Sequence, residues 1–390
     1  MPRFEPFPGL RYATADGNLD DLVAPPYDVI SAEDQAALES RSEHNSVRVE
    51  LPRDEPPLDR YQVAAQLLEQ WLASGVLVVD EPSFYAYRMR YPDEAGRPRH
   101  TVGVIGALGL ETPGEGDVLP HERTTAKALD DRLHLLRATR ANLSPVWGLS
   151  MASGLSSLID VSSSPPAARA TDEDGVVHEL WPVSDPAAVA SISSTVASAP
   201  VVIADGHHRY QTGLAFESEG GDGLIMAYIV ELAEDELSVR GIHRLLSGLP
   251  DGFDLIGALG QFFDPFDTGP VDSTIGQRML DAGGLALVMP DRAKLLRPRT
   301  EVLAAAEHDL DSARLEVALA SLPAHEVAYQ HGWDLAAAAV EKGEAQAAVL
   351  LRPATVEQIA AVGRQRDRMP PKTTFFWPKP RTGLVFRQVR

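Results

Sequence analysis

Apolar residues recur at helical or strand-like spacing along most of the chain, and this pattern predicts an alternation of helices and strands. Residues 58–74 carry apolar side chains three and four positions apart, and Gly75 follows as a helix stop. Leu129, Leu133 and Leu136 keep the same spacing, which predicts a helix over 126–141. Short alternating or continuous apolar runs predict strands at 45–52, 76–80, 83–92, 99–110, 176–183, 201–204 and 223–232.

This mixture of elements indicates the α+β class, with mixed sheets and helices packed on them. Ser31 precedes two acidic residues and predicts the start of a helix that ends near Arg41. The chain has 390 residues, no internal repeat and no long linker. We therefore expect a single unit over 1–390, with the alternative of an N-terminal α+β part, 1–160, and a second α+β part, 161–390.

Composition and charge exclude several classes of protein. The absence of cysteine excludes disulfides, thiolate nucleophiles and cysteine metal sites. A formal net charge of −21 argues against nucleic-acid binding, because the phosphate backbone would be repelled. No apolar run approaches the length of a membrane span, and the first ten residues lack the apolar segment of a signal peptide. We therefore expect a cytoplasmic protein without membrane or nucleic-acid partners.

Positive charge is nevertheless concentrated in two segments. Residues 364–390 contain eight lysines or arginines and one aspartate, and residues 121–140 contain five basic and three acidic residues. One interpretation is a pair of solvated faces that balance the acidic body. The other is that both segments supply positive charge to a site for an anionic small molecule.

The segment VVIADGHHRYQTGLAF, residues 201–216, combines a buried strand, a turn and an amphipathic helix. Such a junction brings backbone N–H groups and the positive end of the helix dipole to one place. Gly206 permits a tight turn, Arg209 is a bidentate donor suited to phosphate, and His207 and His208 add further donors. Asp205 closes the strand as a candidate metal ligand or catalytic carboxylate. The alternative is a helix start whose histidines bond to nearby carbonyl groups.

A second candidate segment is HERTTAKALDDR, residues 121–132. His121 and Glu122 are candidates for a base and its neighbour, and Glu122 is also a candidate Mg²⁺ ligand. Lys127 and Arg132 are candidates for phosphate binding. Thr125 stands where a zinc protease motif needs its second histidine, so that motif is absent. The alternative is a capping acid beside a surface histidine.

The third candidate segment is MPPKTTFFWPKPRTGL, residues 369–384. Its aromatic residues favour burial, so we expect this segment to pack on the body of the protein. Lys372, Thr373 and Lys379 are then candidates for an edge that faces phosphate, unless the lysines of a packed strand are simply solvated. We expect segments 121–132 and 369–384 to converge on residues 205–209. The chain contains no P-loop, no Rossmann glycine motif and no G-x-S-x-G elbow.

These three segments, together with APPYDVIS at 24–31 and ANLSP at 141–145, resemble the family catalogued as domain of unknown function 1015. The resemblance spans roughly residues 4–386. The Asp205–Arg209 box is also similar to the nucleotide-binding box of the ParB/sulfiredoxin superfamily, in which such a segment holds the phosphates of CTP, ATP or ADP. That superfamily includes free-serine kinases. Sulfinic-acid repair by a sulfiredoxin is excluded, since it needs a cysteine.

The resemblance implies a kinase that transfers phosphate from a nucleotide to a hydroxyl amino acid, with free L-serine as the first expectation. ATP or ADP is the expected nucleotide, CTP is an alternative, and Mg²⁺ is the expected cofactor. Glu122, His121 and Asp205 are the candidate catalytic residues, and Asn142 or Asp28 the candidate ligands of the amino acid. Two alternatives stay open: a nucleotide-binding regulator without group transfer, and a phosphate-ester hydrolase with the same pocket. A homodimer is a further expectation.

Overall fold

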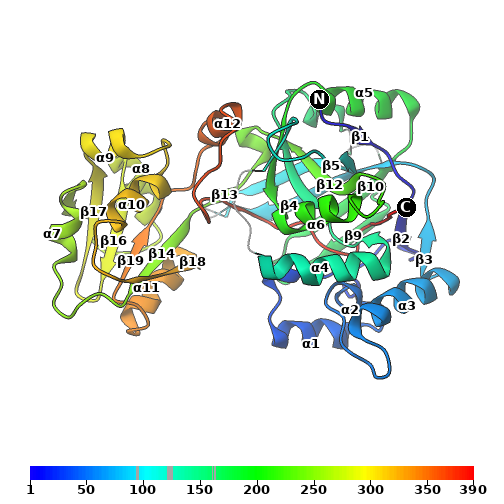
Figure 1. The fold of residues 1–390 in the computed structure, drawn as a ribbon, viewed down its shortest axis with the longest axis horizontal. Coiled ribbons are helices and arrows are strands. Elements are labelled where there is room, and N and C mark those ends of the chain that lie inside the picture. The colour runs from blue at the N-terminus through cyan, green and yellow to red at the C-terminus, as the bar shows by residue number, and fades with distance from the viewer. Residues whose placement is uncertain (94–95, 121–125, 160, 162–163) are drawn as a thin grey trace. The chain divides into compact units, whose positions relative to one another are not determined.

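The computed structural model describes residues 1–390 apart from 94–95, 121–125, 160 and 162–163, and apart from the side chains of 120 and 126–128. The chain divides into two compact units, each described by itself (Figure 1). Unit 1 contains Met1–Ser238 and Pro378–Arg390, and unit 2 contains Val239–Trp377. The expected organisation as one unit over 1–390, and its alternative division after residue 160, stay predictions. The α+β class is confirmed by the helices and mixed sheets of both units.

Unit 1 is built around a sheet of mixed strand direction, nine-stranded within the described residues. Its strands are β1 (Phe4–Glu5), β4 (Phe84–Pro92), β5 (Pro98–Gly109), β6 (Val118–Pro120), β8 (Val146–Ser150), β9 (Ala168–Thr171), β10 (Val177–Val183), β11 (Val201–Asp205) and β12 (Leu224–Glu231). The order is β6-β11-β8-β12-β5-β4-β10-β9, and β1 pairs with β5. β11 runs parallel to β6 and antiparallel to β8, so its carboxyl end is flanked by two other chain segments.

A second, four-stranded sheet of unit 1 joins segments that are far apart in sequence. Its order is β3 (Leu77–Val79), β2 (Gly9–Tyr12), β21 (Phe386–Gln388) and β7 (Ala141–Asn142). The strand from the C-terminal segment, β21, therefore lies between β2 and β7. Through this pairing the segment 378–390 becomes part of unit 1.

The helices of unit 1 cover these sheets. They are η1 (Tyr27–Val29), α1 (Ala32–Arg41), α2 (Val47–Glu50), α3 (Arg60–Ala73), α4 (Ala126–Thr139), η2 (Ser156–Leu158), α5 (Pro186–Ala197), α6 (His207–Glu217) and η3 (Glu234–Glu236). In Figure 1, α5 lies above the strands of the larger sheet and α4 below them. Ile192 of α5 and Tyr210 of α6 are buried in one apolar cluster with Val201 and Ile203 of β11. This packing fixes the strand and the helix that flank the Asp205–Arg209 segment.

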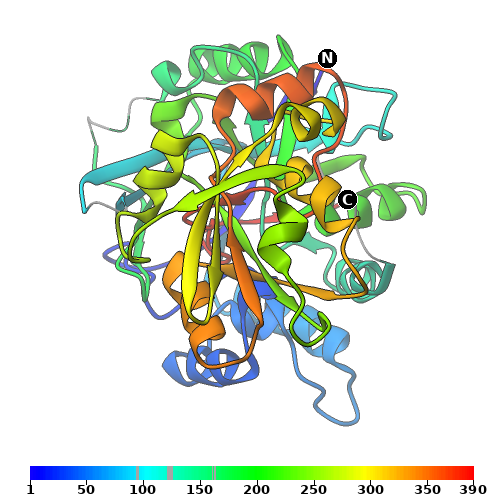
Figure 2. The same cartoon turned by 90° about the vertical axis from the view of Figure 1, so that its left-hand side faces the viewer.

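Unit 2 contains a six-stranded sheet in the order β15 (Phe263–Asp267), β17 (Arg292–Pro298), β16 (Leu285–Met289), β19 (Ala347–Leu350), β14 (Ile242–Ser247) and β18 (Glu326–His331). A short ladder pairs β13 (Val239–Arg240) with β20 (Phe375–Phe376). Its helices are α7 (Leu255–Leu259), α8 (Ile275–Ala282), α9 (Thr300–Ala305), α10 (Asp311–Leu319), α11 (Trp333–Glu341) and α12 (Val356–Arg364). Figure 2 shows the strands of this unit, coloured from yellow-green to orange.

Alternation along β16 explains why both faces of that sheet are covered. Leu285 and Leu287 belong to a cluster that includes residues of α7 and α10, whereas Ala286 and Val288 belong to a cluster that includes residues of α8 and α11. Successive side chains of a strand point to opposite faces, so a continuous apolar run needs a helix layer on each side. Unit 2 therefore has apolar clusters of its own, separate from those of unit 1.

Local sequence signals placed several of the longer elements of unit 1 within a few residues, among them α1, α3, α4, β4, β5, β10 and β12. Ser31 and Asp59 form capping boxes at the starts of α1 and α3, as expected where a short polar residue precedes an amphipathic run. The prediction of a strand over 45–52 is wrong, because Val47–Glu50 form the short helix α2. In the described part of the chain, no helix combines the length and the apolar character that crossing a membrane requires.

Candidate functional site

The candidate site begins at the turn that joins β11 to α6. Gly206 has φ 87° and ψ 28°, the left-handed conformation that glycine adopts without steric cost. This residue is the N-cap of α6 and supplies no side chain to cap the first turn of the helix. The first backbone N–H groups of a helix have no partner within the helix and carry its positive dipole end. The predicted strand–turn–helix geometry is therefore confirmed at this junction.

Asp205 holds two cations at this turn. Its Oδ1 accepts a hydrogen bond from Lys379 Nζ, and its Oδ2 lies 3.1 Å from the Arg209 NH2 atom. Burial acts to raise the pKa of Asp205, but the charges of Lys379 and Arg209 outweigh it and lower the pKa to about 2. The carboxylate is therefore ionised at neutral pH, and its negative charge is balanced on both oxygens.

Arg209 links the turn to the neighbouring segment 141–145. One guanidinium nitrogen donates to the Pro145 carbonyl, another to Asp205, and the buried Nε atom has no hydrogen-bond partner in the described part of the chain. A Cβ atom built at Gly206 would lie 3.0–3.1 Å from the guanidinium. The close approach of backbone and arginine is thus a second reason for glycine at position 206.

His207 and His208 open helix α6, and both are partly exposed beside the turn. A charge on His207 would act on Asp205 in the same direction as Lys379 and Arg209, lowering the pKa of that carboxyl. The described groups at this turn are therefore one carboxylate, one lysine, one arginine and two imidazoles. Such a set attracts anions, and phosphate most of all, since phosphate accepts several charge-assisted hydrogen bonds at once.

A cavity of about 50 Å³ lies beside Arg209. Its polar lining comes from four segments of unit 1, namely Glu50, Arg132, Asn142, Ser144, Arg209 and Thr212. Apolar residues of α4, β12 and the 141–143 segment complete the wall. The cavity therefore brings a buried carboxylate and two arginines together within reach of the β11–α6 turn.

The structure brings Arg132 to this cavity but engages most of its donors. Arg132 donates to the Glu50 carbonyl oxygen at 2.8 Å and to Asp131 at 2.6 and 2.9 Å, and it stacks on the Tyr27 ring at 4.3 Å. Its charge is thus fixed in place at the cavity wall. A role in phosphate binding stays a prediction.

The two candidate ligands of the amino acid differ in their placement. Asn142 lines the cavity, although its Oδ1 already accepts hydrogen bonds from Met226 N at 2.9 Å and Arg387 at 3.1 Å. Asp28 is exposed on η1, next to the tyrosine on which Arg132 stacks. The substrate-binding roles of both residues stay predictions.

The other predicted site residues fall into two groups. His121 and Glu122 lie outside the described residues. Lys127 is the second residue of α4, and its side chain is not among those described. Lys372 and Thr373 belong to unit 2, where the Thr373 hydroxyl bonds to Ser312 at 2.8 Å and donates to the Pro370 carbonyl. The predicted convergence of segment 369–384 on the turn is seen for Lys379, which bonds to Asp205 within unit 1.

Glu50 is a site residue that the sequence did not reveal. The expected strand over 45–52 would have pointed Val47 and Val49 inward and Glu50 outward, because side chains alternate along a strand. In the helix α2 all three of these residues are buried. A four-residue helix carries no periodic signal of its own, so nothing in the local pattern marks Glu50.

The donor set at the turn can be compared with what Mg²⁺ requires. Mg²⁺ prefers carboxylate and phosphate oxygens together with water. Asp205 is a carboxylate of the right kind, but both of its oxygens are held by cations in the protein alone. A magnesium ion at Asp205 would therefore have to displace Lys379 or Arg209, and the predicted metal roles of Asp205 and Glu122 stay predictions.

Comparison with known proteins identifies the family. The family model described as "Protein of unknown function (DUF1015)" matches residues 4–320. The chain belongs to this family, as the motif resemblance predicted. No curated protein matches the chain.

Several solved structures are similar in part. A free serine kinase in complex with AMP is 14% identical, with 67% of this chain and 83% of that chain covered and a TM-score of 0.36. A conserved hypothetical protein from Pyrococcus furiosus is 14% identical over 69% of this chain and 90% of that chain, with a TM-score of 0.37. SbnI with a C-terminal truncation, from Staphylococcus aureus, is 12% identical over 70% and 82%, with a TM-score of 0.38. Identities this low say nothing about shared residues or activity.

Proposed function

We propose that the protein is a cytoplasmic, nucleotide-dependent kinase that phosphorylates the hydroxyl group of an amino acid, free L-serine first. The observation that carries this proposal is the turn at Gly206. There the start of α6, Arg209 and Lys379 gather around one carboxylate and form an anion site. Phosphoryl transfer depends mainly on positioned phosphates and neutralised charge, which is the chemistry that this turn supplies.

In this proposal Gly206, His207, His208 and Arg209 hold the nucleotide phosphates. The acceptor's hydroxyl oxygen forms a bond to the terminal phosphorus while the bridging P–O bond to the leaving nucleotide breaks. Glu122 or His121 takes the hydroxyl proton. A bound Mg²⁺ would neutralise charge on the phosphate oxygens, with Asp205 or Glu122 as its protein ligand, and at Asp205 it would take the place of Lys379 or Arg209.

Further positive charge comes from Lys379 at the turn and from Arg132 at the cavity. Lys127 is proposed to supply a third positive charge. Each of these cations would offset negative charge that shifts toward the leaving nucleotide during transfer. ATP or ADP is the proposed donor. The homodimer expected from the sequence belongs to the same proposal.

A second candidate function is a nucleotide-binding regulator without group transfer. It is favoured by the state of Asp205, whose oxygens are both occupied by cations of the protein itself. Such a turn binds an anion without a metal ion and without any catalytic carboxylate. The two functions agree on the nucleotide and differ on what happens to its terminal phosphate.

One experiment separates these functions. The purified protein is incubated with ATP, ADP or CTP, Mg²⁺ and a panel of hydroxyl amino acids, and ³¹P NMR follows the phosphorus. We expect the O-phosphoserine signal to grow as the nucleotide is consumed. Tight nucleotide binding without turnover would reject the kinase and support the regulator. Release of inorganic phosphate without an acceptor would favour a hydrolase.

The location of the phosphates is tested with Arg209→Ala. We expect nucleotide binding to weaken at least tenfold in isothermal titration calorimetry, because the variant loses a charge-assisted donor at the turn. Arg209→Lys keeps the charge and should retain part of the affinity. The control is Arg97→Ala, which removes an exposed arginine paired with Asp93. Unchanged binding in Arg209→Ala would remove the turn from the proposed site.

A further inference from the structure

The cavity beside Arg209 contains an incompletely bonded carboxylate. Glu50 is 2% exposed, and its Oε1 accepts a hydrogen bond from Ser144 Oγ at 3.0 Å. The nearest Arg132 nitrogen lies 3.9 Å from Oε1, which is longer than the 2.7–2.9 Å typical of a charge-assisted bond. That nitrogen donates instead to the backbone carbonyl of Glu50. The Oε2 atom has no hydrogen-bond partner in the described part of the chain.

Burial raises the free energy of the ionised form of Glu50, because the charge is removed from water. It raises the pKa of Glu50, while the charges of Arg132 and Arg209 act in the opposite direction without reversing the shift. A carboxylate that served only to pair with arginine would be expected to form a close, bidentate contact. Here Arg132 and Arg209 lie near the carboxyl group, but its Oε2 atom has no hydrogen-bond partner among the described residues.

Two more buried polar atoms of the same cavity lack hydrogen-bond partners among the described residues. They are the Arg209 Nε atom and the Thr212 hydroxyl, and both residues line the wall together with Glu50. Each such buried atom costs about 1–3 kcal/mol unless something bonds to it. A carboxyl oxygen, a guanidinium N–H group and a hydroxyl therefore lack a hydrogen-bond partner around one small cavity.

The volume limits what that partner is. A water molecule needs roughly 10–15 Å³ of cavity volume, so a cavity of about 50 Å³ holds on the order of four water-sized groups. This space admits the head group of a small molecule and excludes a nucleotide. Its lining offers a carboxyl group to an ammonium group and two arginine charges to a carboxylate.

We propose that this cavity binds the head group of the amino-acid acceptor, with Glu50 as the ligand of its ammonium group. The Thr212 hydroxyl and the charges of Arg132 and Arg209 then take its carboxylate. The assignment to an acceptor rests on the proposed kinase function, whereas the binding of an amino acid as such does not. It adds a specificity-determining residue, Glu50, to those expected from the sequence.

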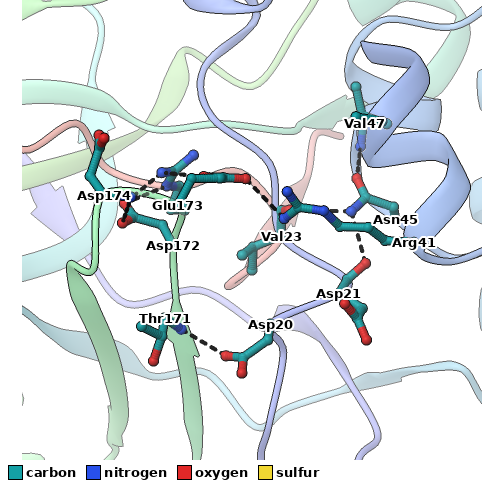
Figure 3. A network of polar contacts seen from close by, with 12 residues as sticks. Asp20, Asp21, Val23, Arg41, Asn45, Val47, Thr171, Asp172, Glu173 and Asp174 are labelled. Carbon is teal, nitrogen blue, oxygen red and sulfur yellow. Dashed lines mark hydrogen bonds and ion pairs between the residues drawn. The ribbon is translucent and has the colours of Figure 1, made fainter. Parts of the chain in front are cut away.

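The short helix that carries Glu50 is held in place before any ligand arrives. Figure 3 shows Asn45 at the start of α2, where its Oδ1 accepts from Val47 N at 2.9 Å and its Nδ2 donates to the Asp21 carbonyl at 2.8 Å. Ser46 donates to the Thr382 carbonyl at 3.0 Å. Because a ligand group that is already oriented loses less freedom on binding, this anchoring favours recognition by Glu50.

The test measures amino-acid binding without nucleotide, by isothermal titration calorimetry on the full chain. The probes are L-serine, L-glycerate, in which a hydroxyl replaces the ammonium group, and ethanolamine, which lacks the carboxylate. We expect L-serine to bind at least tenfold more tightly than either analogue. Equal binding of L-glycerate, or no binding of any probe, would overturn the proposal.

Variants then assign the ammonium contact. Glu50→Gln keeps the side-chain shape and the bond to Ser144, and we expect it to weaken L-serine binding at least tenfold while ATP binding changes less than twofold. Thr212→Val should weaken L-serine binding about threefold. The matched control is Glu179→Gln, a 5% exposed glutamate that pairs with Arg88 and Arg90, and its L-serine affinity should stay within twofold. Wild-type affinity in Glu50→Gln would overturn the assignment.

The outcomes also separate this proposal from the proposed function. If L-serine binds in a Glu50-dependent way but no phosphate is transferred, the kinase fails and the amino-acid site stands. If phosphate is transferred to L-serine with an unchanged KM in Glu50→Gln, the kinase stands and the assignment of Glu50 fails. If Glu50→Gln does not fold, the wild-type comparison of the three probes still tests recognition of the ammonium group, and Thr212→Val tests whether the ligand lies in this cavity.

Discussion

Asp205 and Glu50 are acidic residues near the same arginine, and their surroundings shift the two pKa values in opposite directions. Asp205 is in direct contact with Lys379 and Arg209, so its pKa falls to about 2. Glu50 is more deeply buried and lacks a close cation, so its pKa rises. Pairs of acidic groups whose environments separate their pKa values in this way are frequent in functional sites.

The low pKa of Asp205 makes a prediction about acid stability. A carboxyl group whose pKa is lower in the folded state stabilises that state above its unfolded value near 4, and the stabilisation is lost as the pH falls through about 2. The amount at neutral pH is on the order of 2 kcal/mol for a shift of this size. In urea denaturation between about pH 5 and pH 2.5, we expect the free energy of unfolding of Asp205→Asn to fall less steeply with decreasing pH than that of the wild type.

The comparison for Asp205→Asn is Asp16→Asn, which changes an exposed aspartate that accepts a bond from the Asn18 backbone. This control should follow the wild-type acid dependence. A wild-type acid dependence in Asp205→Asn as well would mean that the ion pairs at the turn do not stabilise the folded state.

Gly206 is predicted to be sensitive to the smallest added side chain. Gly206→Ala introduces a Cβ atom at positive φ and places it about 3.0 Å from the Arg209 guanidinium. We expect a loss of about 1–3 kcal/mol in the free energy of unfolding, and weaker nucleotide binding, because both the backbone and the arginine must shift. Chemical denaturation and calorimetry measure the two effects.

Gly75→Ala is the matched comparison for this variant. Gly75 has φ 78°, but a Cβ atom there would meet nothing within 4 Å. It should therefore show the backbone cost alone and leave nucleotide binding unchanged. Equal destabilisation in the two variants would show that the contact with Arg209 adds nothing.

At the scale of elements, the β11–α6 turn was predictable and the position of α2 was not. Val201–Ala204, Gly206 and the following helix give local signals, since an apolar run, a glycine and a periodic segment stand in order. The helix α2 depends on Asn45 and Ser46, which bond to carbonyl groups at positions 21 and 382. No local window of sequence contains such contacts.

The cluster at Asp205 shows the same limit. The sequence singled out residues 205–209 and expected Lys379 to face phosphate, yet the ion pair between Lys379 and Asp205 spans 174 positions. Their proximity depends on β21, which draws the C-terminal segment between β2 and β7. Residue chemistry was therefore predictable, whereas the partners of each residue followed from the topology.

The anchoring of α2 makes a prediction at this scale. Asn45→Ala removes the bonds that fix the start of α2, and we expect a loss of about 2–3 kcal/mol in the free energy of unfolding. L-serine binding should weaken with it, while ATP binding changes little, because Glu50 is on this helix and the turn at Gly206 is not. Asn18→Ala, at an exposed asparagine, should change neither. Normal L-serine binding in folded Asn45→Ala would show that Glu50 needs no anchoring.

At the scale of the whole molecule, the chain has two units with separate apolar clusters and a net charge of −21. The described part of the proposed nucleotide site, residues 205–209 and Lys379, belongs to unit 1. A ligand stabilises only the structure that binds it, by an amount that grows with the logarithm of its concentration. The two units should therefore respond differently to ATP.

Differential scanning calorimetry measures that difference. We expect two transitions, of which one moves to higher temperature as ATP is added and the other stays in place. Arg209→Ala should abolish the movement without merging the transitions. A single transition that moves as a whole would show that the two units unfold together.

The strand β21 has a consequence for the order in which the molecule is made. A ribosome synthesises unit 2 before it reaches Pro378, so most of unit 1 leaves the ribosome without β21 and without Lys379. During that interval Asp205 lacks one of its two cations, and the edges of β2 and β7 lack their shared neighbour. The proposed anion site is thus completed only when residues 378–390 have been translated, and a nascent chain that stops within unit 2 cannot contain it.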